Sequence, residues 1–222
     1  MGAREPTSRE GVVMAADQRR LDWDERHKAG DFEGDGPNPT LMAGVAGFAP
    51  GSALELASGS GANAVWLAGQ GWRTTAVDWS PVGLANGKAK AQAAGVEVDW
   101  QEHDLFEWSP PARSFDLVAI VYLHLPPQER GPVYARAVAA VVHGGRMVVV
   151  GHDRLHGAEG LDGPDPSRLF TADEIARELL AADPELVVER AEVVRRVPPP
   201  GRAPIDSLLI LRRNRPSKES PR

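Results

Sequence analysis

The segment from Ala53 to Ser80, ALELASGSGANAVWLAGQGWRTTAVDWS, limits the fold of this chain more than any other feature. It begins as an apolar, β-rich run, breaks at a glycine-rich turn, continues as a helical pattern and ends on a second β-rich run that closes with Asp78. A strand, a helix and a second strand joined this closely are typical of a βαβ unit, and such units build parallel sheets. The segment therefore predicts an α/β fold.

The rest of the chain continues the alternation, which predicts a doubly wound, Rossmann-like, mostly parallel sheet covered by helices on both faces. We predict strands at 53–57, 74–78, 96–101, 115–122 and 146–151. Helices are predicted at 63–68, 81–94 and 127–142, and a capping box in LFTADEIARELL starts another. The last two β-rich runs, ELVVERAEVVRRV and APIDSLLILRR, are joined by a short proline-rich turn and are expected to pair antiparallel.

The length of 222 residues suits one α/β domain, and the hydrophobic and charged fractions are those of an ordinary globular protein. Residues 1–20 and 214–222 are polar and rich in turn formers, so we expect flexible tails around a single domain at 21–213.

Charge and composition exclude several classes of function. A net charge of −6 gives no general attraction to nucleic acid or to anionic lipid. No segment has the length and apolarity of a signal peptide or a membrane span, so we expect a cytoplasmic protein. The absence of cysteine excludes disulfides, thiolate metal sites and thiol nucleophiles, and we expect no metal.

The glycine turn carries the first functional signal. Gly59 and Gly61 let the backbone turn tightly and approach a ligand at the N-terminus of the following helix. GSGANA also fits the dinucleotide fingerprint if Ala64 takes the place of its third glycine. A turn without a ligand would explain the glycines, but Asp78 stands where a carboxylate usually accepts both hydroxyls of a ribose.

Two further acids indicate which nucleoside derivative binds. Glu55 lies inside the first predicted strand, where a charge is costly unless it meets a polar ligand group such as an amine. Asp104 follows the third predicted strand, where it could accept a hydrogen bond from an adenine amine. A pyrophosphate would gain from neither carboxylate, whereas adenosine carrying an amino acid would gain from both and from Asp78.

From about Leu21 to Arg213 the sequence resembles the class I S-adenosylmethionine-dependent methyltransferases. The motifs that carry the resemblance are LELASGSG, AVDWS, HDLFEW, FDLVAIVYLHLPP and VHGGRMVVVGHD. WDERH and GANAVWLA further resemble the tellurite-resistance-type and thiopurine-type branch, which acts on small molecules. The resemblance implies a seven-stranded sheet with a reversed terminal strand, S-adenosylmethionine as cofactor and a small-molecule methyl acceptor.

The resemblance also implies residue roles. The cofactor would be held by Glu55, Ala57, Gly59, Gly61, Asp78, Trp79, Asp104, Leu105 and Val121. Glu55 and the turn would hold the methionine part, Asp78 the ribose, and Trp79, Asp104 and the Leu105 backbone the adenine. This sequence departs from the family at Ala57, which replaces the usual first glycine, and at Ala62, where this branch often carries arginine. Ala57 is expected to fit the turn through a negative φ.

Candidate catalytic residues follow the fourth and fifth predicted strands, at the carboxyl edge where open α/β sheets bind ligands. They are Tyr122, His124 and His152, with Trp23 and His27 as candidate substrate contacts. Tyr122 and His124 could instead fill space and cap a helix, and His152 could belong to a simple turn. If the acceptor must lose a proton, His124 or His152 is the expected base.

The expected reaction is methyl transfer by direct displacement to sulfur, oxygen, nitrogen or a chalcogen oxyanion. VYLHLPP does not match the asparagine-proline-proline-tyrosine pattern of amino-group methylases that act on bases, and the absent cysteine excludes covalent cytosine methylation. Two alternatives stay open at this point. One is a protein that binds S-adenosylmethionine without catalysis, and the other is an NAD(P)-dependent oxidoreductase, which would leave Glu55 and Asp104 without a purpose.

Overall fold

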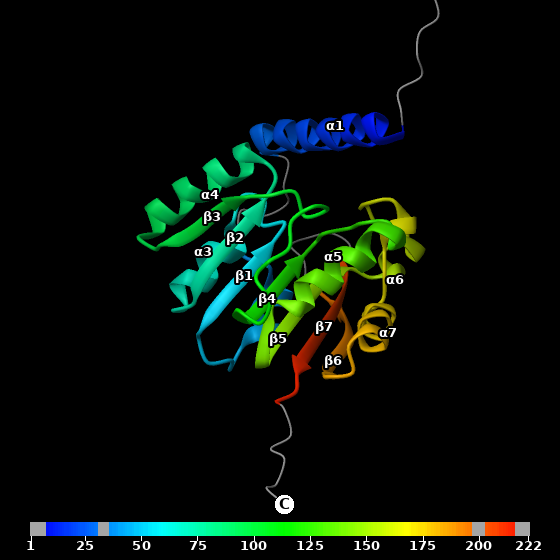
Figure 1. Cartoon of the computed structure of the whole chain (residues 1–222). Helices are drawn as coiled ribbons and strands as arrows, with labels where there is room; N and C mark the ends of the chain where they lie inside the picture. The colour runs from blue at the N-terminus through cyan, green and yellow to red at the C-terminus, as the bar shows by residue number, and fades with distance from the viewer. Residues whose placement is uncertain (1–7, 31–35, 197–202, 216–222) are drawn as a thin grey trace, which may run out of the picture.

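The computed structural model describes residues 8–30, 36–196 and 203–215, with side chains in the first helix described from Gln18 onward. A seven-stranded sheet with the order β3-β2-β1-β4-β5-β7-β6 runs through the molecule (Figure 1). Its strands are β1 (Ser52–Leu56), β2 (Arg73–Asp78), β3 (Val98–Glu102), β4 (Phe115–Val121), β5 (Val141–His152), β6 (Leu186–Arg195) and β7 (Ile205–Arg213).

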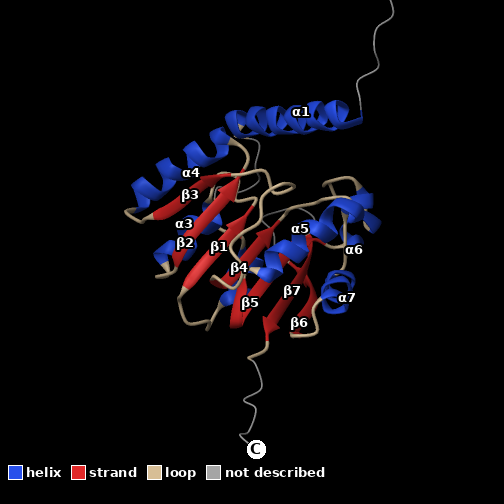
Figure 2. Ribbon diagram, viewed as in Figure 1, coloured by secondary structure: helices blue, strands red, loops and turns tan. Residues whose placement is uncertain are grey.

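Helices lie on both faces of the sheet and across one end of it (Figure 2). They are α1 (Ser8–Ala29), α2 (Pro39–Val45), α3 (Ala62–Gly69), α4 (Pro81–Ala94), α5 (Pro127–Ala139), α6 (Arg154–Ala158) and α7 (Ala172–Ala182), with a short 3-10 helix, η1 (Pro166–Arg168). The structure confirms the predicted doubly wound α/β fold. Its five parallel strands are β3, β2, β1, β4 and β5.

The predicted antiparallel closing pair is also present. β7 pairs antiparallel with both β5 and β6, so it enters the sheet reversed between them. The proline-rich turn expected between the two strands falls at 197–202 and lies outside the described residues.

Helix α4 begins and ends where the sequence predicts, because strong local signals mark both ends. The Ser80 hydroxyl accepts a hydrogen bond from Gly83 N–H, and Pro81 follows at the first helical position. At the other end Gly95 adopts a left-handed φ of 68°, which ends the helix. The capping box predicted for Thr171 and Glu174 is present at the start of α7.

Helix α5 ends three residues earlier than predicted, and β5 starts five residues earlier. The predicted helix ran to Val142, whereas the observed one ends at Ala139 and Val141 already pairs with Phe115 of β4. A short apolar run such as VAAVV suits a buried helix and a buried strand equally well, so periodicity does not locate the boundary.

The N-terminal segment needs a larger correction. We expected a flexible tail up to residue 20, but α1 begins at Ser8 and continues unbroken to Ala29. It crosses the carboxyl edge of the parallel strands (Figure 1). Regular structure therefore extends well before the predicted boundary at Leu21.

Two apolar cores lie on opposite faces of the sheet, and neighbouring residues of one strand alternate between them. In β4, Val118 and Ile120 face the core under α5 and α7, whereas Leu117 and Ala119 face the core under α2 and α3. β5 and β7 alternate in the same way. Burial on both faces explains the almost continuous apolar runs of these strands. Among the described residues, no helix is long and apolar enough to span a membrane.

Candidate active site

The turn after β1 passes through three left-handed residues, Ala57, Gly59 and Gly61, with φ values of 54°, 54° and 70°. The expected negative φ at Ala57 is therefore wrong, and this alanine adopts a conformation that glycine would take with less strain. Gly61 is fixed by packing as well, since a Cβ there would lie 2.2 Å from the indole of Trp100 in β3. These bends bring the chain sharply from β1 into α3.

Glu55 is 1% exposed beneath this turn. Its Oε1 accepts a hydrogen bond of 2.8 Å from Asn63 Nδ2, whereas Oε2 is buried and has no hydrogen-bond partner among the described residues. Burial raises the pKa of the Glu55 carboxyl to about 8, against the opposing hydrogen bonds from Asn63 and the Ala64 backbone. A buried carboxylate oxygen without a partner is suited to an ammonium group of a ligand.

Asp78 ends β2 next to the same turn and is 6% exposed. Its two oxygens accept hydrogen bonds from Gly59 N–H at 2.8 Å and Ser80 N–H at 2.9 Å. Burial raises the pKa of Asp78, and these two backbone bonds oppose the shift. An ionised carboxylate has about four acceptor positions, so two stay available for ribose hydroxyls.

The segment after β3 forms a single turn around Asp104. Asp104 Oδ1 accepts a hydrogen bond from Phe106 N–H at 2.8 Å, and Arg136 of α5 donates to the carbonyls of Leu105 and Phe106. The Phe106 ring lies 6.2 Å from that of Trp79. The structure thus places the three adenine candidates, Trp79, Asp104 and Leu105, after the neighbouring strands β2 and β3, while Val121 packs in the core at the end of β4.

Helix α1 places the two candidate substrate contacts near the cofactor turn. A Cβ on Gly59 would lie 3.2 Å from His27 Cε1, so the buried imidazole touches the turn. Burial lowers the pKa of His27, and the nearby Asp78 opposes that shift. Trp23 is 37% exposed, with the Arg26 guanidinium 4.4 Å from its ring centre. His27 therefore lies beside the glycine turn, on the side of β1 and β2.

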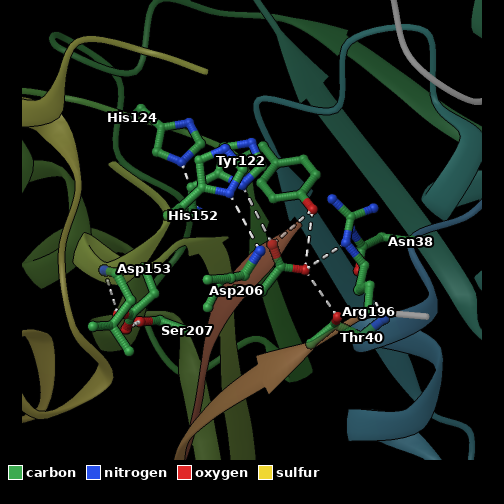
Figure 3. A network of polar contacts seen from close by, with 12 residues as sticks. Asn38, Thr40, Tyr122, His124, His152, Asp153, Arg196, Asp206 and Ser207 are labelled. Carbon is green, nitrogen blue, oxygen red and sulfur yellow. Dashed lines mark hydrogen bonds and ion pairs between the residues drawn. The ribbon is translucent and has the colours of Figure 1, made fainter. Parts of the chain in front are cut away.

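The expected base His124 is engaged differently from our prediction. Its Nε2 accepts a hydrogen bond of 2.9 Å from the backbone N–H of His152, so the ring proton is on Nδ1 (Figure 3). Burial, followed by the charge of His152, lowers the pKa of His124 to about 3. A neutral imidazole whose one lone pair is already occupied cannot take a proton from an acceptor. In this arrangement His124 orients the end of β5.

Tyr122 and His152 stay together at the carboxyl edge, with ring centres 4.8 Å apart. Tyr122 has a φ of 59°, and burial raises the pKa of its hydroxyl. Ala57 and Tyr122 directly follow β1 and β4, the adjacent strands at which the order of the sheet reverses. Strained backbone often occurs at functional sites, and this pair lies where α/β sheets bind ligands.

Sequence reasoning missed the residue at the centre of this group, Asp206 in β7. It is fully buried and receives hydrogen bonds from the hydroxyls of Tyr122 and Thr40 (Figure 3). Arg196 Nε lies 3.0 Å from its Oδ2. A lone acid inside the apolar run PIDSLLIL was the available signal, because a buried carboxylate needs partners. Asn63 was missed as well, since an asparagine in a first helical turn is common.

Comparisons with known proteins bear on the alternatives that the sequence leaves open. Residues 53–145, from β1 into β5, match the family model described as a methyltransferase domain. The chain carries a methyltransferase domain at these residues. A search of curated protein sequences gives no match. The match to a methyltransferase domain does not support the NAD(P)-dependent alternative.

Solved structures share the fold of this methyltransferase at low sequence identity. The 1,6-didemethyltoxoflavin-N1-methyltransferase of Burkholderia thailandensis is 22% identical with a TM-score of 0.65, covering 97% of this chain and 94% of its own. Magnesium protoporphyrin IX methyltransferase of Synechocystis PCC 6803 is 15% identical with a TM-score of 0.61, covering 96% and 90%. The cyclase SpnF is 16% identical with a TM-score of 0.62, covering 78% of each chain.

The described residues fit the methyltransferase cofactor. The partnerless Glu55 Oε2 matches an amino group, and Asp78 keeps acceptor positions for a ribose. Two acids beside one turn supply no positive charge to the pyrophosphate of a dinucleotide. Among the described residues, no cluster of three or more His, Asp or Glu is arranged to hold a metal ion.

Proposed function

We propose that this methyltransferase transfers the methyl group of S-adenosylmethionine to a small-molecule acceptor that reaches Tyr122 and His152. The observation that carries the proposal is the position of α1. This helix crosses the carboxyl edge of the sheet, over the ends of the parallel strands (Figure 1). A helix over this edge obstructs a polymer, which favours a compact acceptor.

Contacts at two points along α1 hold it in this position. Toward α4, the Ser80 hydroxyl donates a hydrogen bond to Asp24, which is 6% exposed. Toward α5, Arg19 forms an ion pair of 3.1 Å with Glu129, and its guanidinium lies 4.9 Å from the Phe106 ring centre. Because α1 bridges both halves of the edge, it can also exclude water from the reacting atoms.

Each cofactor residue has a proposed role in this arrangement. Glu55 binds the amino group, the Gly59 and Gly61 backbone lies along the methionine part, and Asp78 accepts the ribose hydroxyls. Trp79, Asp104 and Leu105 bind adenine, with Ala57 and Val121 shaping the turn and the strand end beneath. Bound S-adenosylmethionine supplies an electrophilic methyl group, so the chain mainly positions the acceptor in line with it.

The proposal of a small-molecule acceptor has support apart from the position of α1. The Burkholderia protein, similar along nearly its whole length, is named for methylating a small heterocycle. A net charge of −6 adds no attraction to nucleic acid. The similar fold of SpnF, named as a cyclase, is the observation that favours the alternative of a cofactor-binding protein without methyl transfer.

A screen with methyl-labelled S-adenosylmethionine tests the proposal. The panel should contain phenols, N-heterocycles, thiols and chalcogen oxyanions, with tRNA and duplex DNA as polymer controls. We expect label in at least one small acceptor and in neither polymer, and slower transfer by Asp78→Ala at a limiting cofactor concentration. Cofactor binding without transfer to any acceptor would favour the non-catalytic alternative, and label in a polymer would contradict the proposal.

A further inference from the structure

Asp206 is a carboxylate with no access to solvent that lies where β7 enters the sheet. Tyr122 Oη donates to both of its oxygens, at 3.0 and 3.1 Å, and Thr40 Oγ1 donates to Oδ2 at 3.0 Å. Arg196 supplies the neighbouring positive charge. These groups fix the carboxylate in one orientation, and they leave Oδ1 3.4 Å from the Nδ1 of His152.

His152 is held between other rings. Its imidazole stacks on that of His156 at 4.0 Å and on the Tyr122 ring at 4.8 Å, and its backbone N–H is bound by His124. Nδ1 is buried and makes no hydrogen bond to a described residue, and its contact with Asp206 Oδ1 at 3.4 Å is at ion-pair distance. Nε2, on the other side of the ring, makes no hydrogen bond to any described residue, and 16% of the side chain is exposed.

The other two histidines of this cluster have no nitrogen available. His124 Nε2 is occupied by the His152 N–H. His156 accepts from Ile205 N–H through Nδ1, so its Nε2 carries the proton and donates to the Asp162 carbonyl at 2.8 Å. Among the three stacked rings, His152 alone combines a nearby carboxylate with a nitrogen that no described residue occupies.

We propose that Asp206 is a positioning residue that holds His152 with its proton on Nδ1, so that Nε2 serves as the general base for an acceptor bearing O–H or N–H. This inference rests on the proposed methyl transfer and assigns its base. It also narrows the acceptor to a class that is protonated at neutral pH, such as a phenol or an N–H heterocycle.

The step balances. The acceptor O–H or N–H bond breaks and its proton joins His152 Nε2, giving an imidazolium beside the Asp206 carboxylate. The electron pair left on the acceptor forms the new bond to the methyl carbon as the carbon–sulfur bond breaks, which releases S-adenosylhomocysteine. The imidazolium then returns its proton to solvent.

The charges around His152 set the expected effect of Asp206. The Asp206 carboxylate favours the imidazolium, whereas Arg196 opposes it, and the neighbouring Tyr122, His124 and His156 are neutral in the bonds described. Removing the Asp206 charge should therefore leave a proton on His152 Nδ1 without its neighbouring carboxylate.

NMR of the full chain with ¹⁵N-labelled histidine tests this without any acceptor. We expect neutral His152 to carry its proton on Nδ1, and Asp206→Asn to move the proton toward Nε2. His143, at the opposite end of β5, is the internal control and should not change. A proton on Nε2 in the wild-type protein, or an unchanged tautomer in the variant, would overturn the proposal. The wild-type measurement decides the question even if Asp206→Asn does not fold.

Rates of methyl transfer to acceptors from the screen provide a second test of His152 as the base. For p-cresol, a phenol protonated at neutral pH, His152→Ala should lower kcat by roughly 10²–10⁴-fold, with partial rescue by added imidazole. Asp206→Asn should lower kcat for the same acceptor. For 4-nitrothiophenol, which is ionised there, both losses should be small. A merely structural role would slow both acceptors alike and give no rescue by imidazole.

The NMR and kinetic measurements distinguish failure of the proposed base from failure of the proposed methyl transfer. The expected tautomer without methyl transfer to any acceptor would contradict the proposed function and leave the Asp206–His152 pair standing as a structural pair. Methyl transfer to phenols with an unchanged rate in His152→Ala would preserve the proposed function and refute the base.

Discussion

Asn63 Nδ2 donates a hydrogen bond of 2.8 Å to Glu55 Oε1, and so joins the first turn of α3 to the buried end of β1. Asn63 Oδ1 in turn accepts from the backbone N–H of Asn38. This chain of bonds fixes one oxygen of the Glu55 carboxyl and leaves the other buried without a hydrogen-bond partner among the described residues.

The raised pKa of Glu55 predicts a stability that falls with pH in the cofactor-free protein. The folded pKa is about 8 and the ordinary value is 4.5, so between them the native state holds a proton that the unfolded state has lost. The contribution is fully present below about pH 4.5 and is lost as the pH rises through 8, with a slope of up to ~1.4 kcal/mol per pH unit.

Urea unfolding at several pH values, compared between wild type and Glu55→Gln, measures this contribution. The variant carries no titrating carboxyl and should lose most of the slope, whereas Glu97→Gln, at an exposed position, should keep it. Equal slopes in wild type and Glu55→Gln would show that the carboxyl is ionised in the folded protein.

Asp78→Ala should weaken the binding of S-adenosylhomocysteine at least about tenfold. The substitution removes two charge-assisted bonds to the ribose, each worth roughly 1.5–3 kcal/mol before compensation by water. It also releases the N–H groups of Gly59 and Ser80, so the melting temperature should fall too. Calorimetric titration gives the affinity, and Asp99→Ala, at an exposed carboxylate on β3, is the matched control. Unchanged affinity would mean that the nucleoside binds elsewhere.

Ala57→Gly should stabilise the protein by up to about 1 kcal/mol. A φ of 54° is strained for alanine and relaxed for glycine, and this relief exceeds the added entropy of the unfolded chain. Ala68→Gly, inside α3, should have the opposite sign, with a loss of roughly 0.5–1 kcal/mol. Urea unfolding measures both variants, and a destabilised Ala57→Gly would show that the alanine methyl group makes a compensating contact.

His124→Ala should cost roughly 1–3 kcal/mol of stability, because it leaves the buried His152 N–H without a partner. The rate with a protonated acceptor should fall less than in His152→Ala, since the His124 ring only orients the end of β5 that carries His152 and takes no proton itself. The melting temperature and the rates of both variants, measured on matched preparations, check this. A loss as large as that of His152→Ala in a variant with an unchanged melting temperature would restore His124 as the base.

Local sequence signals predicted the elements around the cofactor. Ser80, Pro81 and Gly95 mark α4 within a few residues of the helix ends, and the structure places that helix where they indicate. Glu55 and Asp78 follow from the alternation of strands and turns, because adjacent parallel strands must bring their carboxyl ends together. The sequence alone therefore determined the fold class and the position of the cofactor candidates.

The tertiary structure decided the conformation of Ala57, the course of α1 and the roles of the histidines. The backbone angle at Ala57 depends on how the chain must turn above β2, which no property of alanine reveals. Asp206 lies 84 residues beyond Tyr122, and the two meet because β7 enters the sheet reversed next to β5. Hydrogen bonds between such distant residues leave no periodic trace in a sequence, since they depend on which strands become neighbours and which polar groups burial forces to pair.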